Sequence, residues 1–222
     1  VGAAGLLANL SYGNDQLITF YAVILAASVL ALVISIFRTN AMDLRRPVIF
    51  AVTLIAVGAW LDTDISLNSA PYMFYVSQFM IAFAAVYFMG PMVFEGMFRA
   101  IANGPAYIIS FSVIFGISQT VGGLAGAAGI QAFTTIRTQT HYADMVGSMS
   151  ANGLDSATMT QMLQGVQRQA TVAAYDDLFF LMAVTATITT IVLLVIYSYY
   201  LYHKRNPLGN ELAAIAKMRE AK

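Results

Sequence analysis

The chain has 222 residues, of which 59% are hydrophobic and 10% are charged, and its mean hydropathy is +0.72. An ordinary soluble domain has about 45–50% apolar and about 25% charged residues, so this composition excludes a soluble fold and indicates an integral membrane protein. The formal net charge is zero, which gives no sign of a nucleic-acid partner. Because the chain has no cysteine and its two histidines, His141 and His203, are far apart, we expect neither a disulfide nor a metal site.

The first thirteen residues, VGAAGLLANLSYG, contain no basic residue and no full-length apolar segment, so they do not read as a signal peptide. We expect residues 1–13 to form the end of a helix whose beginning lies outside this sequence. By that interpretation the chain is a fragment, or one piece of a split protein.

A helix needs about 20 apolar residues to cross a bilayer core of about 30 Å. Four segments are long enough: Leu17–Phe37, Tyr72–Phe94, Tyr107–Phe133 and Leu178–Tyr202. A further segment, Val48–Leu61, has only 14 apolar or small residues in a row, so by length alone it could cross the membrane or re-enter it. An independent test is needed to decide.

The basic residues supply that test, because lysine and arginine near span ends collect on the cytoplasmic side. If all five segments cross, one side receives two basic residues, Arg137 and Arg168. The other side receives nine: Arg38, Arg45, Arg46, Arg99, Lys204, Arg205, Lys217, Arg219 and Lys222. We therefore predict five crossings, four of them within residues 14–133 and the last over residues 178–202. The N-terminus then lies outside, and residues 203–222 form a cytoplasmic tail.

The segment between the last two predicted spans, residues 134–177, is predicted to be a long outer loop. Its second half carries apolar residues at helical spacing, after Asp155 or Ser156 as a capping residue, which predicts an amphipathic helix at the outer membrane surface. These residues are Met159, Met162, Leu163, Val166 and Ala170. The helix is either a simple linker, or a cap over an exit or a docking surface.

Carboxylates are absent from mid-membrane depth in all five predicted spans, so the chain alone shows no proton relay. Asp62 lies at the outer end of the second span, and Asp176 and Asp177 lie where the last span begins, a place where acids complement the helix dipole. Each position is explained without a function. Since the sequence also has no Ser/His/Asp set and no phosphate-cradling glycine loop, we expect neither an enzyme nor a cofactor.

Neutral polar and aromatic residues are the better candidates for a substrate cavity. A glutamine amide in hydrocarbon needs a partner, which is either another helix or a polar ligand. Nearby aromatic rings would suit an apolar ligand, and would equally suit lipid. The candidates are Gln78, Phe79, Phe83, Tyr87, Ser118 and Gln119. Next to Gln119, the pair Gly122 and Gly126 has the spacing of small residues at helix–helix contacts, which predicts close packing.

Three stretches of the chain resemble one family, the fourteen-span EmrB/QacA-type drug:proton antiporters of the major facilitator superfamily. RTNAMDLRRP is similar to that family's arginine-bearing cytoplasmic loop, and SQFMIAFAAVYFMGPM is similar to the fourth helix of its C-terminal half. The most specific stretch is the long outer segment, in which TTIRTQTHYADM leads out of one span and QGVQRQATVAAYDDLFFLMA leads into the last. The resemblance covers most of the chain.

This resemblance implies an all-α membrane fold, the C-terminal half of a major facilitator fold, with five transmembrane helices, the tail of a sixth and a long periplasmic loop. It also implies a multi-pass protein of the bacterial inner membrane that exports lipophilic or amphipathic toxic compounds in exchange for protons. The partners it implies are the missing N-terminal half, membrane lipid, a periplasmic adaptor and an outer-membrane channel. The residues it implies for a cytoplasmic gating loop are Arg38, Asp43, Arg45 and Arg46. A membrane scaffold or accessory subunit that keeps the fold without transport is the alternative.

Overall fold

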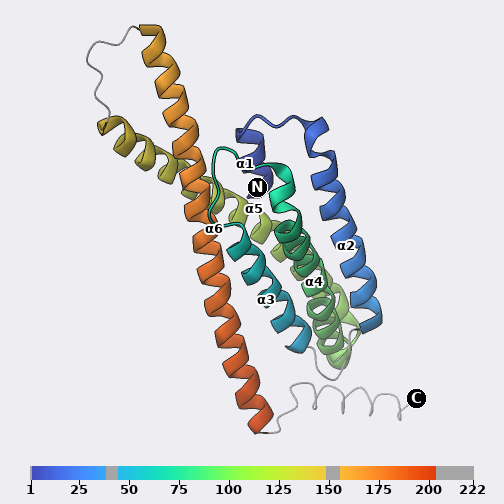
Figure 1. Ribbon diagram of the computed structural model, residues 1–222. Helices are drawn as coiled ribbons and strands as arrows, with labels where there is room; N and C mark the ends of the chain where they lie inside the picture. Colours follow the sequence, from blue (N-terminus) through green and yellow to red (C-terminus); the bar gives the residue numbers. More distant parts are fainter. Residues whose placement is uncertain (1, 39–44, 149–155, 204–222) are drawn as a thin grey trace, which may run out of the picture.

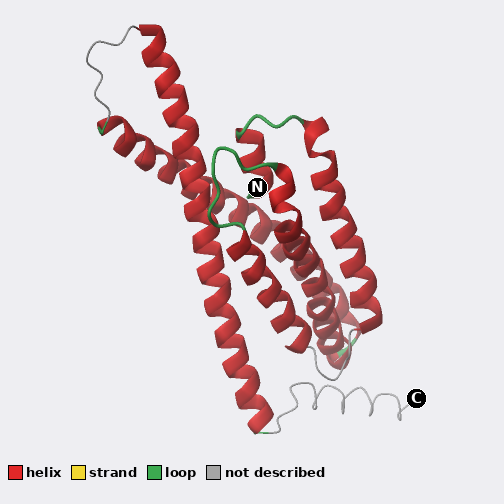
Figure 2. Cartoon of the chain, viewed as in Figure 1, coloured by secondary structure: helices red, strands yellow, loops and turns green. Residues whose placement is uncertain are grey.

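The computed structural model describes residues 2–38, 45–148 and 156–203, and every regular element in these ranges is helical (Figure 2). Six α-helices and two short 3-10 helices follow one another in these described ranges. Their bounds are α1 Ala3–Asn9, η1 Asn14–Leu17, α2 Ile18–Arg38, α3 Arg45–Leu61, η2 Pro71–Phe74, α4 Tyr75–Asn103, α5 Pro105–Gly147 and α6 Ser156–Tyr202. The prediction of an all-helical fold is confirmed.

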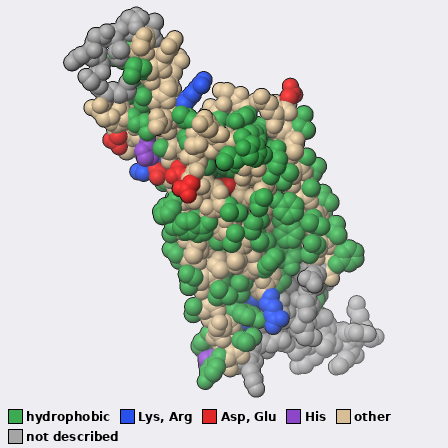
Figure 3. Space-filling view, viewed as in Figure 1, with side chains coloured by type: hydrophobic (Ala, Val, Ile, Leu, Met, Phe, Trp, Pro, Cys, Tyr) green, Lys and Arg blue, Asp and Glu red, His purple; other side chains and the backbone are tan. Residues whose placement is uncertain are grey.

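Four helical stretches in the described residues are long and apolar enough to cross a membrane. They are Asn14–Phe37, Pro71–Asn103, Ala106–Gly147 and Thr158–Tyr202. Figure 3 shows the matching surface, a broad hydrophobic face with charged side chains gathered toward its two ends. The chain is therefore suited to pass through a membrane several times.

The short segment Val48–Leu61, predicted as a further crossing, lies in α3, a helix of 17 residues and about 26 Å that is not among these four. It packs between α4 and α6, and helices α2 to α6 run in alternating directions along the chain (Figure 1). The ends of α2, α4 and α6 therefore lie at one end of the bundle, together with the starts of α3 and α5. We call it the basic end, because Arg45, Arg46 and Arg99 lie there, and the opposite one the acidic end, after Asp62, Asp64, Asp176 and Asp177.

Alanine residues bring the middle of the bundle together. Ala31 of α2, Ala51 of α3 and Ala84 of α4 are all fully buried in one cluster with Tyr87. Because alanine has only a methyl group, helix backbones can approach closely at these points, which is how helices associate when lipid supplies no hydrophobic drive. Helices α2, α3 and α4 therefore form one tightly packed unit.

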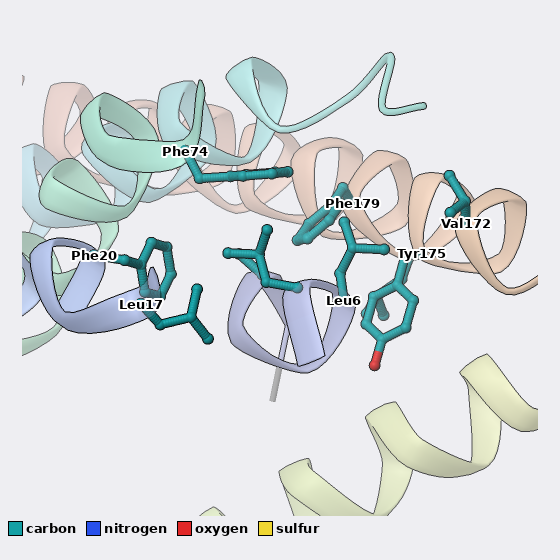
Figure 4. Close-up of a cluster of buried hydrophobic side chains, with 10 residues drawn as sticks. Leu6, Leu17, Phe20, Phe74, Val172, Tyr175 and Phe179 are labelled. Carbon is teal, nitrogen blue, oxygen red and sulfur yellow. The ribbon is translucent and has the colours of Figure 1, made fainter. Parts of the chain in front are cut away.

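The short helix α1 packs its apolar side chains against the acidic end of the bundle. Leu6 and Leu7 are completely buried there, against Phe20 of α2 and Phe179 of α6 (Figure 4). The chain leaves α1 through Ser11, whose positive φ of 68° turns it toward η1 and α2. This cluster ties the first residues of the described chain to the last helix.

The segment predicted as a long outer loop, residues 134–177, is helical over most of its length. Helix α5 continues without a break to Gly147, and α6 begins at Ser156 and runs through to Tyr202. The predicted amphipathic helix is thus the first part of α6 and not a separate element. At about 65 and about 70 Å, both helices are much longer than a bilayer core of about 30 Å.

The physical reason is that a change in polarity does not end a helix. Residues 134–147 and 156–177 contain no proline, and glutamine, methionine, alanine and arginine are all good helix formers. The threonine hydroxyls in these stretches bond to carbonyl groups of their own helix, as Thr135 does to Gln131 and Thr171 to Gln167, without ending it. The result is a helical hairpin, formed by the second half of α5 and the first half of α6, that extends beyond the other helices (Figure 1).

Candidate functional site

The aromatic candidates of α4 form one stack along the helix. Phe79 lies 6.4 Å from Phe83, and Phe83 lies 5.5 Å from Tyr87, measured between ring centroids. Tyr87 is 8% exposed and packs edge-to-face on Phe50 of α3. Phe79 and Phe83 are partly exposed, so the stack contributes to the packing of α3 against α4 chiefly through the buried Tyr87.

Gln78 has the partner that its amide requires. Its Nε2 donates a hydrogen bond of 2.6 Å to Oδ2 of Asp62, the first residue after α3. Asp62 is only 1% exposed, and its other oxygen, Oδ1, is buried with no hydrogen-bond partner among the described residues. Burial raises the pKa of Asp62 to about 6, although hydrogen bonding with Ser77 and Gln78 works in the opposite direction.

Ser118 and Gln119 face open space on α5, apart from the α4 stack. Both side chains are exposed, and no residue of the membrane-crossing window of α5 is buried. A Cβ atom added at Gly122 or Gly126 would meet nothing within 4 Å. The predicted packing of this glycine pair is therefore not found among the described residues.

The basic residues at the start of α3 contact the far end of α6. The Arg46 Nε donates a hydrogen bond of 2.8 Å to the Tyr197 hydroxyl, and the Arg45 guanidinium lies 4.1 Å from the centre of the Tyr200 ring. These contacts join residues about 150 positions apart and hold α3 to α6 at the basic end. Of the other gating-loop candidates, Arg38 is the last residue of α2, and Asp43 lies outside the described residues.

A cluster of charged residues joins α5 to α6 at the base of the hairpin. Oδ2 of Asp177 accepts a hydrogen bond of 2.7 Å from the Arg137 Nε and lies 2.7 Å from the Nε2 of His141. Its neighbour Asp176 accepts hydrogen bonds through Oδ1 from the backbone N–H groups of Asp64, at 2.9 Å, and Ile65, at 3.4 Å. The two carboxylates thus hold α6 to α5 on one side and to the α3–η2 loop on the other.

The role expected for Asp176 and Asp177 at a helix start is wrong. Helix α6 begins at Ser156, twenty residues before Asp176, so neither carboxylate lies in its first turn. The helix dipole acts only within the first or last turn. Their positions are explained instead by the contacts with α5 and with the loop after α3.

Among the described residues, three of the grooves on the surface of the bundle are large enough to hold a small molecule. The first, of ≈ 690 Å³, lies between α2 and α4 and is lined almost entirely by apolar side chains such as Leu32, Phe94 and Met97. The second, of ≈ 470 Å³, is also apolar and lies between α3, α5 and α6. The third, of ≈ 580 Å³, lies between α1, α5 and α6 and is lined by hydroxyl and amide groups, including Gln131 and Thr171. None of the six cavity candidates lines any of the three.

Sequence reasoning identified Gln78 but missed the importance of Asp62, and it missed Tyr197, Tyr200 and the Arg137–Asp177–His141 cluster. The available signals were weak. Tyr197 and Tyr200 are three residues apart and therefore on one helix face, and Arg137 and His141 are four apart. Neither spacing identifies the residue on another helix that these side chains contact.

Three comparisons with known proteins bear on this chain. No protein-family model, no curated protein and no solved structure matches it.

Proposed function

We propose that the chain is the C-terminal part of a proton-driven transporter that exports lipophilic or amphipathic compounds across a bacterial inner membrane. The observation that carries this proposal is the uncovered face of α5. On this helix Ser118, Gln119, Gly122 and Gly126 fall on one side by helical spacing, and the described residues leave all four open. A glutamine amide facing lipid is costly, so this face suits a water-lined path between two helical units.

The other helices provide the contrast. Helices α2, α3 and α4 are joined by buried alanines, whereas α5, which packs mainly against α6, has no buried residue in its membrane-crossing window. A transporter made of two bundles around a central path would need one helix of this kind in each bundle. The resemblance of the sequence to drug:proton antiporters agrees with this arrangement.

The apolar groove between α2 and α4 supports the proposed substrate class. Its ring and thioether side chains, Phe94, Phe98, Met89 and Met97, are adaptable surfaces for unrelated apolar molecules. It lies on α4, which also carries the aromatic stack of Phe79, Phe83 and Tyr87. A compound dissolved in the lipid could reach this groove without crossing water.

The test is the accumulation of a lipophilic fluorescent dye in cells that make the full-length protein. Expression should lower the steady-state dye level, and a protonophore should abolish the difference. The variant Gln119→Leu, on the open face of α5, should lose export, whereas Leu124→Ala, on the opposite face, should keep it. Dye retention that is unchanged by expression across a broad panel of dyes would contradict the proposal.

We also propose that the helical hairpin is the docking surface for a periplasmic adaptor. The first part of α6, Ser156–Gln169, is about 21 Å long at about 1.5 Å per residue and precedes the buried Ala170. Met162 and Arg168 are exposed along this part. The double variant Met162→Asp and Arg168→Glu should lose adaptor capture in a pull-down from membranes, whereas Glu95→Gln at the basic end should not. Equal capture by both would contradict the docking role.

A further inference from the structure

Asp62 is the only carboxyl or basic side chain among the buried residues that the structure describes. It follows the last turn of α3 directly, at the acidic end of the bundle, and faces Ser77 and Gln78 in the first turn of α4. Its hydrogen bond with Gln78 joins the end of α3 to α4, and the proposed transport path does not use this carboxyl. A buried carboxyl in this position therefore needs its own explanation.

The hydrogen bonds around Asp62 fit a carboxyl group that takes up a proton. Oδ2 accepts from Gln78, but Oδ1 is buried and has no hydrogen-bond partner in the part of the chain that the structure describes, which is costly for an ionised oxygen. The single hydrogen of the Ser77 hydroxyl is directed to the Phe74 carbonyl, 3.0 Å away, and the ionised Asp62 carboxylate competes for it. A protonated Asp62 could instead donate to the Ser77 oxygen and leave that hydrogen on the Phe74 carbonyl.

Among the described residues, no positively charged side chain pairs with the Asp62 carboxylate. Asp64, in the same loop, is exposed, and Asp176 of α6 is bound to the backbone N–H groups of Asp64 and Ile65. Arg137 and His141 of α5 are both engaged by Asp177. No salt bridge in the described part of the chain involves Asp62.

We propose that Asp62 is a proton-binding site that couples the protonation of a buried carboxyl to the packing of α3 against α4. The carboxylate takes one proton from water at the acidic end and becomes a neutral acid; no other bond is made or broken. Release of the proton restores the negative charge between the two helices. Within the proposed transporter, on which this role in transport rests, Asp62 is a carboxyl that binds the driving proton.

The single tryptophan of the chain can report this event. Trp60 lies two residues before Asp62, its Nε1 donates a hydrogen bond of 3.0 Å to Thr187 of α6, and its ring packs edge-to-face on Phe180. A change in the end of α3 should therefore change the environment of the indole. Because the burial of Asp62 raises its pKa to about 6, the transition should fall close to that pH.

The experiment is a pH titration of Trp60 fluorescence in the full chain reconstituted in lipid nanodiscs. The unmodified protein should show a transition with a midpoint near pH 6, and Asp62→Asn should abolish it. Asp64→Asn and His141→Gln, which change the neighbouring titratable groups, should keep it. A transition that persists in Asp62→Asn, or that is lost in His141→Gln, would overturn the proposal.

A second variant keeps the test decisive if Asp62→Asn does not fold. The Gln78 amide stabilises the ionised carboxyl, so Gln78→Leu should move the midpoint to higher pH. A midpoint that does not move would overturn the role of Asp62.

Transport assays separate this inference from the proposed function. In the full-length transporter, Asp62→Asn should lose dye export driven by a pH gradient and keep dye binding. If the unmodified protein exports no dye while the Trp60 transition depends on Asp62, the proposed function is wrong and the proton site stands. If export driven by the pH gradient survives in Asp62→Asn, the role of Asp62 in transport is wrong.

Discussion

At the residue scale, the buried carboxyl of Asp62 should make the stability of the protein depend on pH. Its pKa is raised from 3.8 to about 6 in the folded chain, so the folded state holds the proton more tightly than the unfolded state does. The stabilising effect of protonation is complete below about pH 4 and is lost as the pH rises through about 6. At higher pH the ionised group therefore destabilises the fold.

Replacing Asp62 with asparagine should remove this penalty. At about 1.4 kcal/mol per pKa unit, we expect Asp62→Asn to raise the free energy of unfolding by up to about 3 kcal/mol near pH 8, and by little near pH 4. The measurement is thermal unfolding in detergent at both pH values. Asp64→Asn, at an exposed carboxyl in the same loop, is the matched control and should change neither value. A gain for Asp62→Asn that is equal at the two pH values would contradict the prediction.

The carboxylate of Asp177 should stabilise the base of the hairpin. Asp177→Asn removes the charge that holds both Arg137 and His141. The side chains of Asp177 and Arg137 are 31% and 40% exposed, so solvent screening limits the expected loss to about 1 kcal/mol or less. Amide hydrogen exchange should become a few-fold faster over residues 134–147, and Asp144→Asn, on the exposed side of α5, should leave it unchanged. Equal exchange in the two variants would mean that apolar contacts alone hold the hairpin.

At the element scale, close helix contacts depend on particular glycines and not on the number of glycines in a helix. A Cβ at Gly58 of α3 would lie 2.7 Å from Cγ1 of Ile81 and 3.0 Å from the backbone oxygen of Ser77, both in α4. A Cβ at Gly126 of α5 would meet nothing within 4 Å. The sequence predicted close helix packing at the α5 glycines. In the structure, the close contact is instead at Gly58, between α3 and α4.

Alanine at these two positions should have opposite effects. Gly58→Ala forces the backbone of α4 away from α3 and should destabilise the chain by about 1–3 kcal/mol. Gly126→Ala meets no neighbour and should be neutral, or stabilise the helix by up to about 1 kcal/mol. Thermal unfolding of the two variants in the same detergent measures the difference. A destabilised Gly126→Ala chain would show that a partner covers α5 under these conditions.

The sequence predicted helices well and helix ends unevenly. The ends of α2 and α6 were predicted to within a residue, at Phe37 and Tyr202, because in both places an apolar run gives way to charge. Helix α4 was predicted to end at Phe94 but continues to Asn103, and the Arg99 Nη2 lies 2.6 Å from the Glu95 carboxylate inside that extension. Hydropathy indicates where a helix leaves apolar surroundings, whereas the helix itself ends only where a residue breaks its hydrogen bonds.

At the scale of the whole molecule, the contacts between distant residues could not be predicted. The demand of Gln78 for a polar partner was evident from the sequence, but its partner Asp62 was identified only by the fold. Arg46 and Tyr197 are separated by 151 positions. Which residues meet across a bundle depends on the rotation of each helix about its axis, and the weak amphipathicity of a membrane span leaves that rotation open.

Cysteine labelling in the proposed full-length transporter should distinguish the two faces of α5. This chain has no cysteine, so only cysteines outside it would have to be replaced before labelling. Ser118→Cys and Gly122→Cys, on the open polar face, should react with a water-soluble maleimide in membranes. Val113→Cys and Leu124→Cys, on the opposite face of the helix, should not react, because that face would lie in lipid. The contrast is expected because a glutamine amide, and the backbone left exposed at glycines, need a hydrogen-bonding partner inside a membrane. Lipid cannot supply one, whereas water or protein can. If none of the four cysteines reacts, α5 is surrounded by lipid or packed against protein without water. The hypothesis of a scaffold without transport would then be favoured over the proposed transporter.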